Sequence, residues 1–143
     1  QQMLRRLAGL LGHAITDPNR LTDLLDQRSR ARALRSMRCL PFSLQLFRDL
    51  QRQGLDATNI WADQHRYGRS RSWYRHAGAL EDDLRWLITV GVLRREVDGQ
   101  GLTSRFRLTP LGRQLLDDQK TPLSQKASLL DHLRHQIRRF LSF

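Results

Sequence analysis

The alternation of apolar and polar residues over residues 91–113 predicts a β-hairpin followed by a helix. A first strand over residues 92–97 leads into Asp98-Gly99-Gln100-Gly101, whose glycines can take the positive φ values of a short turn. The return strand alternates with a period of two, as in a ribbon with one face in solvent. Thr109 and Pro110 then form a typical helix start. One face of the return strand carries Leu102, Ser104, Phe106 and Leu108, and the other carries Thr103, Arg105, Arg107 and Thr109.

The spacing of apolar residues over residues 42–50 predicts the first of three helices upstream of the hairpin. Asp56 can cap a second helix, which turns Ile60 and Trp61 inward and ends in the turn Tyr67-Gly68. The apolar positions of the first helix, at helical spacing, are Phe42, Leu46, Phe47 and Leu50.

The third helix is predicted to begin near Ser70 or Ser72 and to end at Gly91. Helix, helix, long helix, hairpin and helix therefore follow one another over residues 40–118. This order predicts a mostly α fold with a small β-hairpin, namely a winged helix-turn-helix core with additional N- and C-terminal helices. The apolar stripe of the third helix is Ala77, Leu80, Leu84, Leu87 and Ile88.

The residues around the hairpin resemble a known family. A leucine-rich helix with the exit Gly91-Val92-Leu93, a turn containing glycine, and Leu108-Thr109-Pro110-Leu111-Gly112 follow in this order. The combination resembles winged helix-turn-helix regulators of the MarR and PadR kind. The resemblance implies DNA binding by a dimer that is built from helices outside the winged core. It also implies that Asp98 and Arg105 support a minor-groove contact of the wing.

The composition adds a strong positive charge. The chain has 143 residues, and its 25 lysines and arginines against 14 acids give a formal net charge of +11, which favours a polyanionic partner. Only Lys120 and Lys126 are lysines, and arginine suits bidentate phosphate and guanine contacts, although GC-rich codons favour arginine as well. The predicted organisation is N-terminal helices over residues 1–38, a winged helix-turn-helix domain over residues 39–119, and a C-terminal helix over residues 120–143.

Residues 65–79 combine arginine and aromatic residues and contain no acid. They connect the second predicted helix to the third, where helix-turn-helix proteins meet phosphates and enter the major groove. We therefore expect Arg66 and Arg69 to contact DNA, with an ordinary solvated face as the alternative. The candidate recognition residues are Ser70, Arg71, Ser72, Arg75 and His76.

Two further features qualify this interpretation. The acids Glu81, Asp82 and Asp83 follow in the third helix, and we expect them to point away from DNA or to pair with Arg85 and other arginines. Trp73 either stacks on a base or packs at the edge of the core, and packing is the expected role of a large aromatic side chain.

A second arginine cluster lies in helix-permissive residues 28–38. On a helix Arg28, Arg32, Arg35 and Arg38 share one face, and we call these four residues the basic ridge. The ridge can extend a DNA footprint through backbone contacts, bind RNA, or cover an acidic partner. In the wing, Arg105 and Arg107 are expected to meet phosphate or the minor groove.

The ends of the chain carry apolar residues in regular repeats, and residues 120–143 repeat them at about seven-residue spacing. This pattern predicts a homodimer, whereas the alternative is that the terminal helices complete the core of one chain. The predicted interface residues are Leu123, Leu130, Leu133, Ile137 and Phe140.

The sequence contains no phosphate-binding glycine loop, nucleophile elbow or zinc-protease motif, so we expect no enzyme activity and no cofactor. Cys39 is the single cysteine and the histidines lack ligand spacing, so no metal site is predicted. No membrane span or signal peptide is recognisable, and we expect a cytoplasmic, nucleoid-associated protein.

Three functional hypotheses follow. The first is a double-stranded DNA-binding regulator of transcription, whose third helix enters the major groove and whose wing and terminal helices assist. The second is a protein-interaction or adaptor module of a larger assembly. The third is a replication or partition component that binds DNA.

Overall fold

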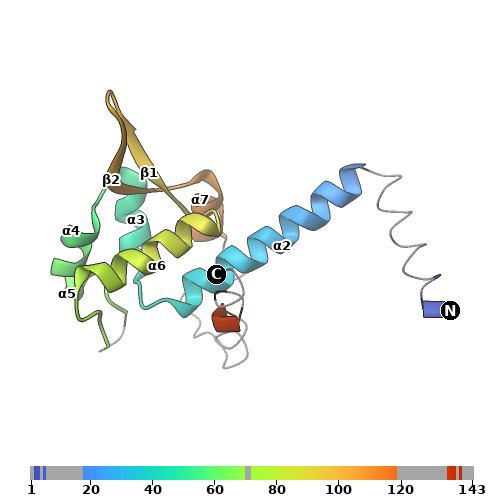
Figure 1. Ribbon diagram of the computed structural model, residues 1–143, viewed down its shortest axis with the longest axis horizontal. Helices are drawn as coiled ribbons and strands as arrows, with labels where there is room; N and C mark the ends of the chain where they lie inside the picture. The colour runs from blue at the N-terminus through green and yellow to red at the C-terminus, as the bar shows by residue number, and fades with distance from the viewer. Residues whose placement is uncertain are drawn as a thin grey trace.

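The computed structural model describes residues 2, 3, 5, 18–69, 72–118, 135–137 and 139. An antiparallel hairpin of β1 (Leu93–Asp98) and β2 (Gly101–Leu108) stands between the last two labelled helices. The structure confirms the predicted class, mostly α with a small β-hairpin. Figure 1 shows the hairpin projecting from a group of short helices, while α2 extends to one side. The helices are α2 (Pro18–Cys39), α3 (Leu44–Arg52), α4 (Ala57–Ala62), α5 (Gln64–Tyr67), α6 (Ala77–Thr89) and α7 (Pro110–Asp117).

One hydrophobic core joins these elements. It takes side chains from the second half of α2, from α3, α4, α6 and α7, and from the base of the hairpin, so α2 folds against the same core as the elements that follow it. The largest fully buried side chains are Met37, Phe42, Leu46, Phe47, Leu50, Ile60, Leu80, Leu84, Leu87, Val92, Leu93 and Phe106.

The first two predicted helices differ from the observed ones at their ends. The first helix begins at Leu44 and not at Phe42, because the Ser43 hydroxyl accepts from the Leu46 amide and caps it. Phe42 instead forms an isolated β-bridge and stays buried. The second helix is capped by Asp56 as predicted, but it breaks at Asp63 into α4 and α5.

Trp61 corrects a further prediction. Ile60 is fully buried, but Trp61 is 37% exposed and does not turn into the core. Its indole Nε1 donates to the carbonyl of Tyr74 at 3.0 Å. Trp61 therefore joins α4 to the connection that precedes α6.

The hairpin is anchored to the helices at its base. Leu93 pairs with Leu108 and Arg95 with Phe106 in the antiparallel register. Phe106 also exchanges backbone hydrogen bonds of 2.8 and 3.2 Å with Leu55, so the α3–α4 connection adds one bridge to the hairpin. As predicted, Thr109 caps α7, accepting from the Gly112 amide at 3.1 Å.

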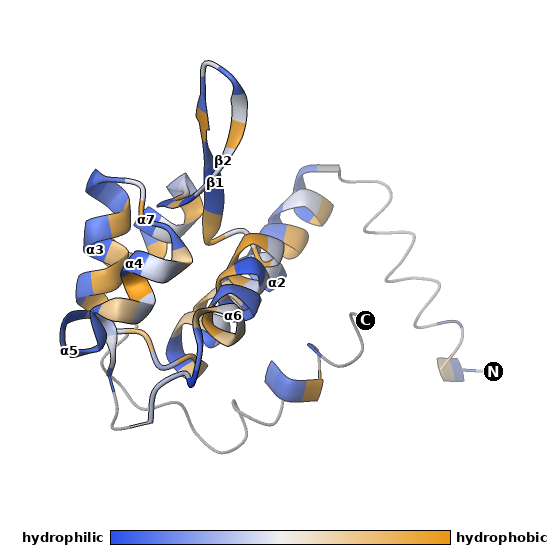
Figure 2. Ribbon diagram, turned by 60° about the vertical axis from the view of Figure 1, so that its left-hand side comes forward, coloured by the Kyte–Doolittle hydropathy of each residue, from blue (hydrophilic) through white to orange (hydrophobic). Residues whose placement is uncertain are grey.

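The tip of the hairpin extends beyond the core. The predicted apolar face of β2 is confirmed at Phe106 and Leu108, which are buried, but not at Leu102, which is 76% exposed. Val97 lies opposite Leu102 in the register and is 62% exposed. Apolar colour therefore reaches the projecting part of the hairpin in Figure 2.

The C-terminal residues that the structure describes contact the chain's own helices. The His135 Nδ1 lies 3.4 Å from the Ser36 Oγ of α2, and its ring stands against Trp86 of α6. Arg139 forms an ion pair with Asp83 of α6. Among the described residues, no helix is long and apolar enough to span a membrane.

Gly112 provides a test of how tightly the hairpin packs against α7. A Cβ atom at this position would lie 2.6 Å from both the Val92 carbonyl oxygen and the Leu108 Cδ1. We expect Gly112→Ala to lower the free energy of unfolding by about 1–3 kcal/mol in urea titrations, because the backbone carbonyl cannot yield. Gly99→Ala is the control, since a Cβ atom at the hairpin tip meets nothing within 4 Å. Equal stability of the two variants would contradict this packing.

Candidate nucleic-acid interface

The predicted recognition residues that the structure describes do not lie within a helix. α6 begins at Ala77, and the His76 Nδ1 accepts from the Ala79 amide at 3.1 Å, so His76 is the N-cap. Ser72 and Arg75 are exposed in the connection before it, and Ser70 and Arg71 lie outside the described residues. The prediction that the third helix begins at Ser70 or Ser72 is therefore wrong.

Aromatic packing explains this late helix start. Trp73 and Tyr74 contact each other with ring centroids 5.2 Å apart, and both pack against Phe42. The Trp73 Nε1 donates to the Trp61 carbonyl at 3.1 Å. These contacts hold the connection along α4 in a non-helical form. Trp73 thus takes the predicted packing role.

α6 presents acidic side chains. Glu81 forms ion pairs with Arg85 at 3.2 Å and with Arg95 at 3.6 Å. The sequence predicts such pairing with Arg85 and other arginines. Asp83 accepts from the Tyr74 hydroxyl at 2.6 Å, and Asp82 is exposed. The helix that was expected to enter the major groove therefore offers no unpaired arginine.

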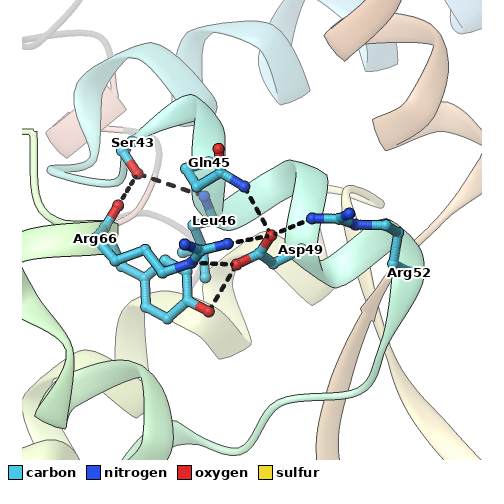
Figure 3. A network of polar contacts seen from close by, with 7 residues as sticks. Ser43, Gln45, Leu46, Asp49, Arg52 and Arg66 are labelled. Atoms are coloured by element: carbon cyan, nitrogen blue, oxygen red, sulfur yellow. Dashed lines mark hydrogen bonds and ion pairs between the residues drawn. The ribbon is translucent and has the colours of Figure 1, made fainter.

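Arg66 belongs to a network of donors around the carboxylate of Asp49, a residue that is only 2% exposed (Figure 3). Its Nε donates to the Asp49 Oδ2 at 2.7 Å, and the Tyr67 hydroxyl donates to the same oxygen at 2.8 Å. Gln45 and Arg52 donate to the Oδ1 at 2.8 and 3.0 Å. The hydrogen bond from Arg66, aided by the other donors, holds the pKa of Asp49 far below its ordinary value.

Arg69 binds carbonyl groups at the C-terminal end of α2. Its Nη2 donates to the carbonyl of Leu40 at 2.9 Å and to that of Arg38. Such a cation stabilises the unsatisfied carbonyls at a helix C-terminus. Partial desolvation of the guanidinium lowers the pKa of Arg69, and the guanidinium is bound to carbonyl groups of its own chain.

The two wing arginines share one carboxylate. The Nε of Arg105 lies 2.6 Å from Glu96, and the Nη1 of Arg107 lies 3.4 Å from the other oxygen of Glu96. Arg107 also donates to the Gln51 carbonyl at 3.0 Å, at the end of α3. The hydrogen bond from Arg105 lowers the pKa of Glu96. Arg105 remains exposed, while Arg107 is half-buried.

Arg28 and Arg32 of the basic ridge differ from these arginines, because they form no such ion pair with a described residue. Arg28 is exposed, Arg32 and Arg35 are half-buried, and all three line an open hollow of about 580 Å³ on α2. In the described part of the chain, no carboxylate lies within ion-pair distance of Arg28 or Arg32. The Nε atoms of Arg32 and Arg38 are buried without an acceptor.

The predicted dimer interface lies mostly outside the described residues. Leu123, Leu130, Leu133 and Phe140 lie outside the described residues, and Ile137 is 48% exposed. Among the described residues, no group of three or more potential ligands could hold a metal ion.

Sequence reasoning missed Asp49, Glu96 and the role of Arg69. A signal was available only for Asp49, an acid on the apolar stripe of α3 beside Leu46 and Leu50. The partners of Glu96 and Arg69 come from distant positions in the chain, so no local pattern reveals them.

A family model described as Npun_F0494-like matches residues 23–139. The chain belongs to this family. The matched residues include most of α2 with its ridge, all of α3 to α7, and the hairpin. No curated protein and no solved structure matched the chain.

Asp49 provides a test of the network. We expect Asp49→Asn to lower the free energy of unfolding at pH 7 by about 3 kcal/mol, because a buried ion pair loses its anion. Because the folded-state pKa is depressed, the carboxylate stabilises the fold above an unfolded pKa of about 4, and this contribution falls as the pH drops below it. The difference in unfolding free energy between the wild type and Asp49→Asn should therefore become smaller in urea titrations below pH 4.

Asp56→Asn is the matched control, because asparagine caps a helix as well as aspartate does. Its unfolding free energy should stay near that of the wild type. A stability gap for Asp49→Asn that does not change between pH 7 and pH 3 would contradict a role for the ionised carboxylate.

Proposed function

We propose that this protein binds double-stranded DNA as a winged helix-turn-helix protein, mainly through phosphate contacts of the basic ridge. The order α3, Leu55 bridge, α4, α6 and hairpin supports a winged helix architecture. A role in transcriptional regulation is the one that the MarR and PadR resemblance implies.

The observation that carries the proposal is the contrast between two sets of arginines. In the helical body and the wing, Asp49, Glu81, Asp83 and Glu96 each pair with one or two arginines, which reduces the charge that these arginines offer to a partner. Arg28 and Arg32 have no such partner in the described part of the chain. Unpaired guanidinium groups beside an open hollow suit the bidentate geometry of phosphate.

Two arginines of the body and the wing are proposed to make secondary contacts in the same function. Arg75 and Arg105 are exposed near the start of α6 and on the wing, where a winged helix approaches the duplex. Because the one arginine of α6 is paired with Glu81, contacts to the DNA backbone rather than to bases account for most of the proposed affinity.

A second candidate function is a protein-interaction module. Two observations favour it, namely the exposed Asp82 on α6 and the apolar pair Val97 and Leu102 at the hairpin tip. A minor-groove contact by the wing would need basic groups at its tip, but the turn there contributes only Asp98 as a charged residue. In this case the wing tip and α6 contact another protein, and DNA is not bound.

DNA binding is tested by fluorescence anisotropy with a labelled random duplex at a series of salt concentrations. We expect affinity to fall steeply with salt, and Arg28→Ala with Arg32→Ala to reduce the slope of log K against log salt by roughly 2, since each lost phosphate contact removes about 0.9. Arg105→Ala with Arg107→Ala should reduce it less.

The charge-matched control is Arg48→Ala with Arg113→Ala, two exposed arginines outside the ridge. It removes the same net charge, so a specific ridge predicts a clearly smaller loss of affinity. Absence of binding at low salt, or affinity independent of salt, would refute DNA binding and leave the protein-interaction function. Equal losses for the ridge and control variants would show that the contact surface is elsewhere.

A further inference from the structure

The N-terminal half of α2 stands apart from the core. Residues 19–29 are all exposed, and Figure 1 shows this part of the helix extending away from the body. The second half of the same helix packs into the core through Ala33 and Met37, and Leu40 does so directly after the helix ends. An isolated helix of about 11 residues is only marginally stable in water, so the projecting half gains little from its own hydrogen bonds.

This half carries an apolar stripe. Leu21, Leu24 and Leu25 are 41%, 48% and 55% exposed, and their spacing of three and four residues places them on one side of the helix. Three leucines clustered in this way differ from single exposed apolar residues, which need no explanation. The stripe leads into the hollow that Leu25, Arg28 and Arg32 line.

Charge identifies a suitable partner. Residues 18–29 contain two arginines and two aspartates, so this half of α2 is neutral in a chain with a net charge of +11. Two copies of so basic a protein repel each other over most of their surface, and they can meet where the local charge is balanced. The stripe is such a place.

We propose that this apolar half of α2 docks against the same half of a second copy of the chain, in an antiparallel pair about a two-fold axis. A parallel pair would place one basic ridge beside the other. An antiparallel pair separates the ridges toward opposite ends of the interface.

The overlap is only about 16 Å long, from 11 residues at 1.5 Å each, so the buried area falls below that of a standard interface. We therefore expect a weak dimer, with a dissociation constant on the order of 10–100 μM. This inference does not rest on DNA binding, because it concerns the oligomeric state of the chain without nucleic acid.

The test is sedimentation velocity of the full chain from 5 to 200 μM, concentrations chosen to bracket that range. We expect the wild type to shift from monomer to dimer, and Leu21→Gln with Leu24→Gln and Leu25→Gln to remain monomeric with an unchanged thermal midpoint. Val97→Gln with Leu102→Gln is the matched control, since it removes exposed apolar side chains at the hairpin tip. This control should dimerise like the wild type.

A further variant, Ile137→Gln, separates the proposal from the interface that the C-terminal repeat predicts. A dimer that is lost in Ile137→Gln but kept in the α2 variant would overturn the α2 interface. A wild type that stays monomeric at 200 μM would overturn it too. If the α2 substitutions then lower the thermal midpoint by several degrees, the stripe is covered within its own chain.

Disulfide trapping tests the orientation in a Cys39→Ser background. For an antiparallel pair centred between Leu24 and Leu25, Leu21→Cys in one copy should cross-link to Arg28→Cys in another, because residues 21 and 28 lie at equal distances from that centre. Rapid cross-linking of Leu21→Cys to itself would overturn the antiparallel arrangement.

Discussion

The buried carboxylate of Asp49 is the interaction on which the helical body depends. A charge that is almost fully removed from water must be matched by donors, and Asp49 collects them from both α3 and α5. These hydrogen bonds hold Arg66 and Tyr67 in place. The carbonyl of Arg66 in turn accepts from the Ser43 hydroxyl, and the carbonyl of Tyr67 accepts from the Ser43 amide. The end of α5 is thereby joined to the start of α3. The connection to α6 leaves the body from this joint.

The same requirement organises charge throughout the body. Carboxylates at the edges of the core attract arginines from neighbouring elements, as Glu96 does with Arg105 and Arg107 on the hairpin. Arginines near a carboxylate thus become part of the fold, and their charge is of little use to a distant polyanion. α2 lacks a comparable set of carboxylates beside Arg28 and Arg32. Arg28 and Arg32 therefore add unpaired positive charge on α2 to that of exposed arginines of the body such as Arg48, Arg75 and Arg113.

The two halves of α2 illustrate how one helix can serve two purposes. Its second half is buried on one side and presents the ridge on another, whereas its first half projects with three partly exposed leucines. A helix continues past the core only where its backbone remains hydrogen-bonded and its side chains find partners or water. If two copies meet on the leucines, the two ridges extend from a common centre, which would suit a long and regular anion such as a duplex.

The sequence by itself determined the class of fold, the hairpin with its turn, and the caps at Asp56 and Thr109, because these depend on residues that are close together in the chain. Only the tertiary structure decided where α6 begins, since Trp73 and Tyr74 pack against Phe42 from a distant segment and prevent an earlier helical turn. It also decided which arginines are neutralised. Arg66 and Arg69 looked like phosphate ligands in an acid-free stretch, but their partners Asp49 and Leu40 lie many residues away. A local pattern records the charge of a side chain, whereas the folded chain determines which groups that charge meets.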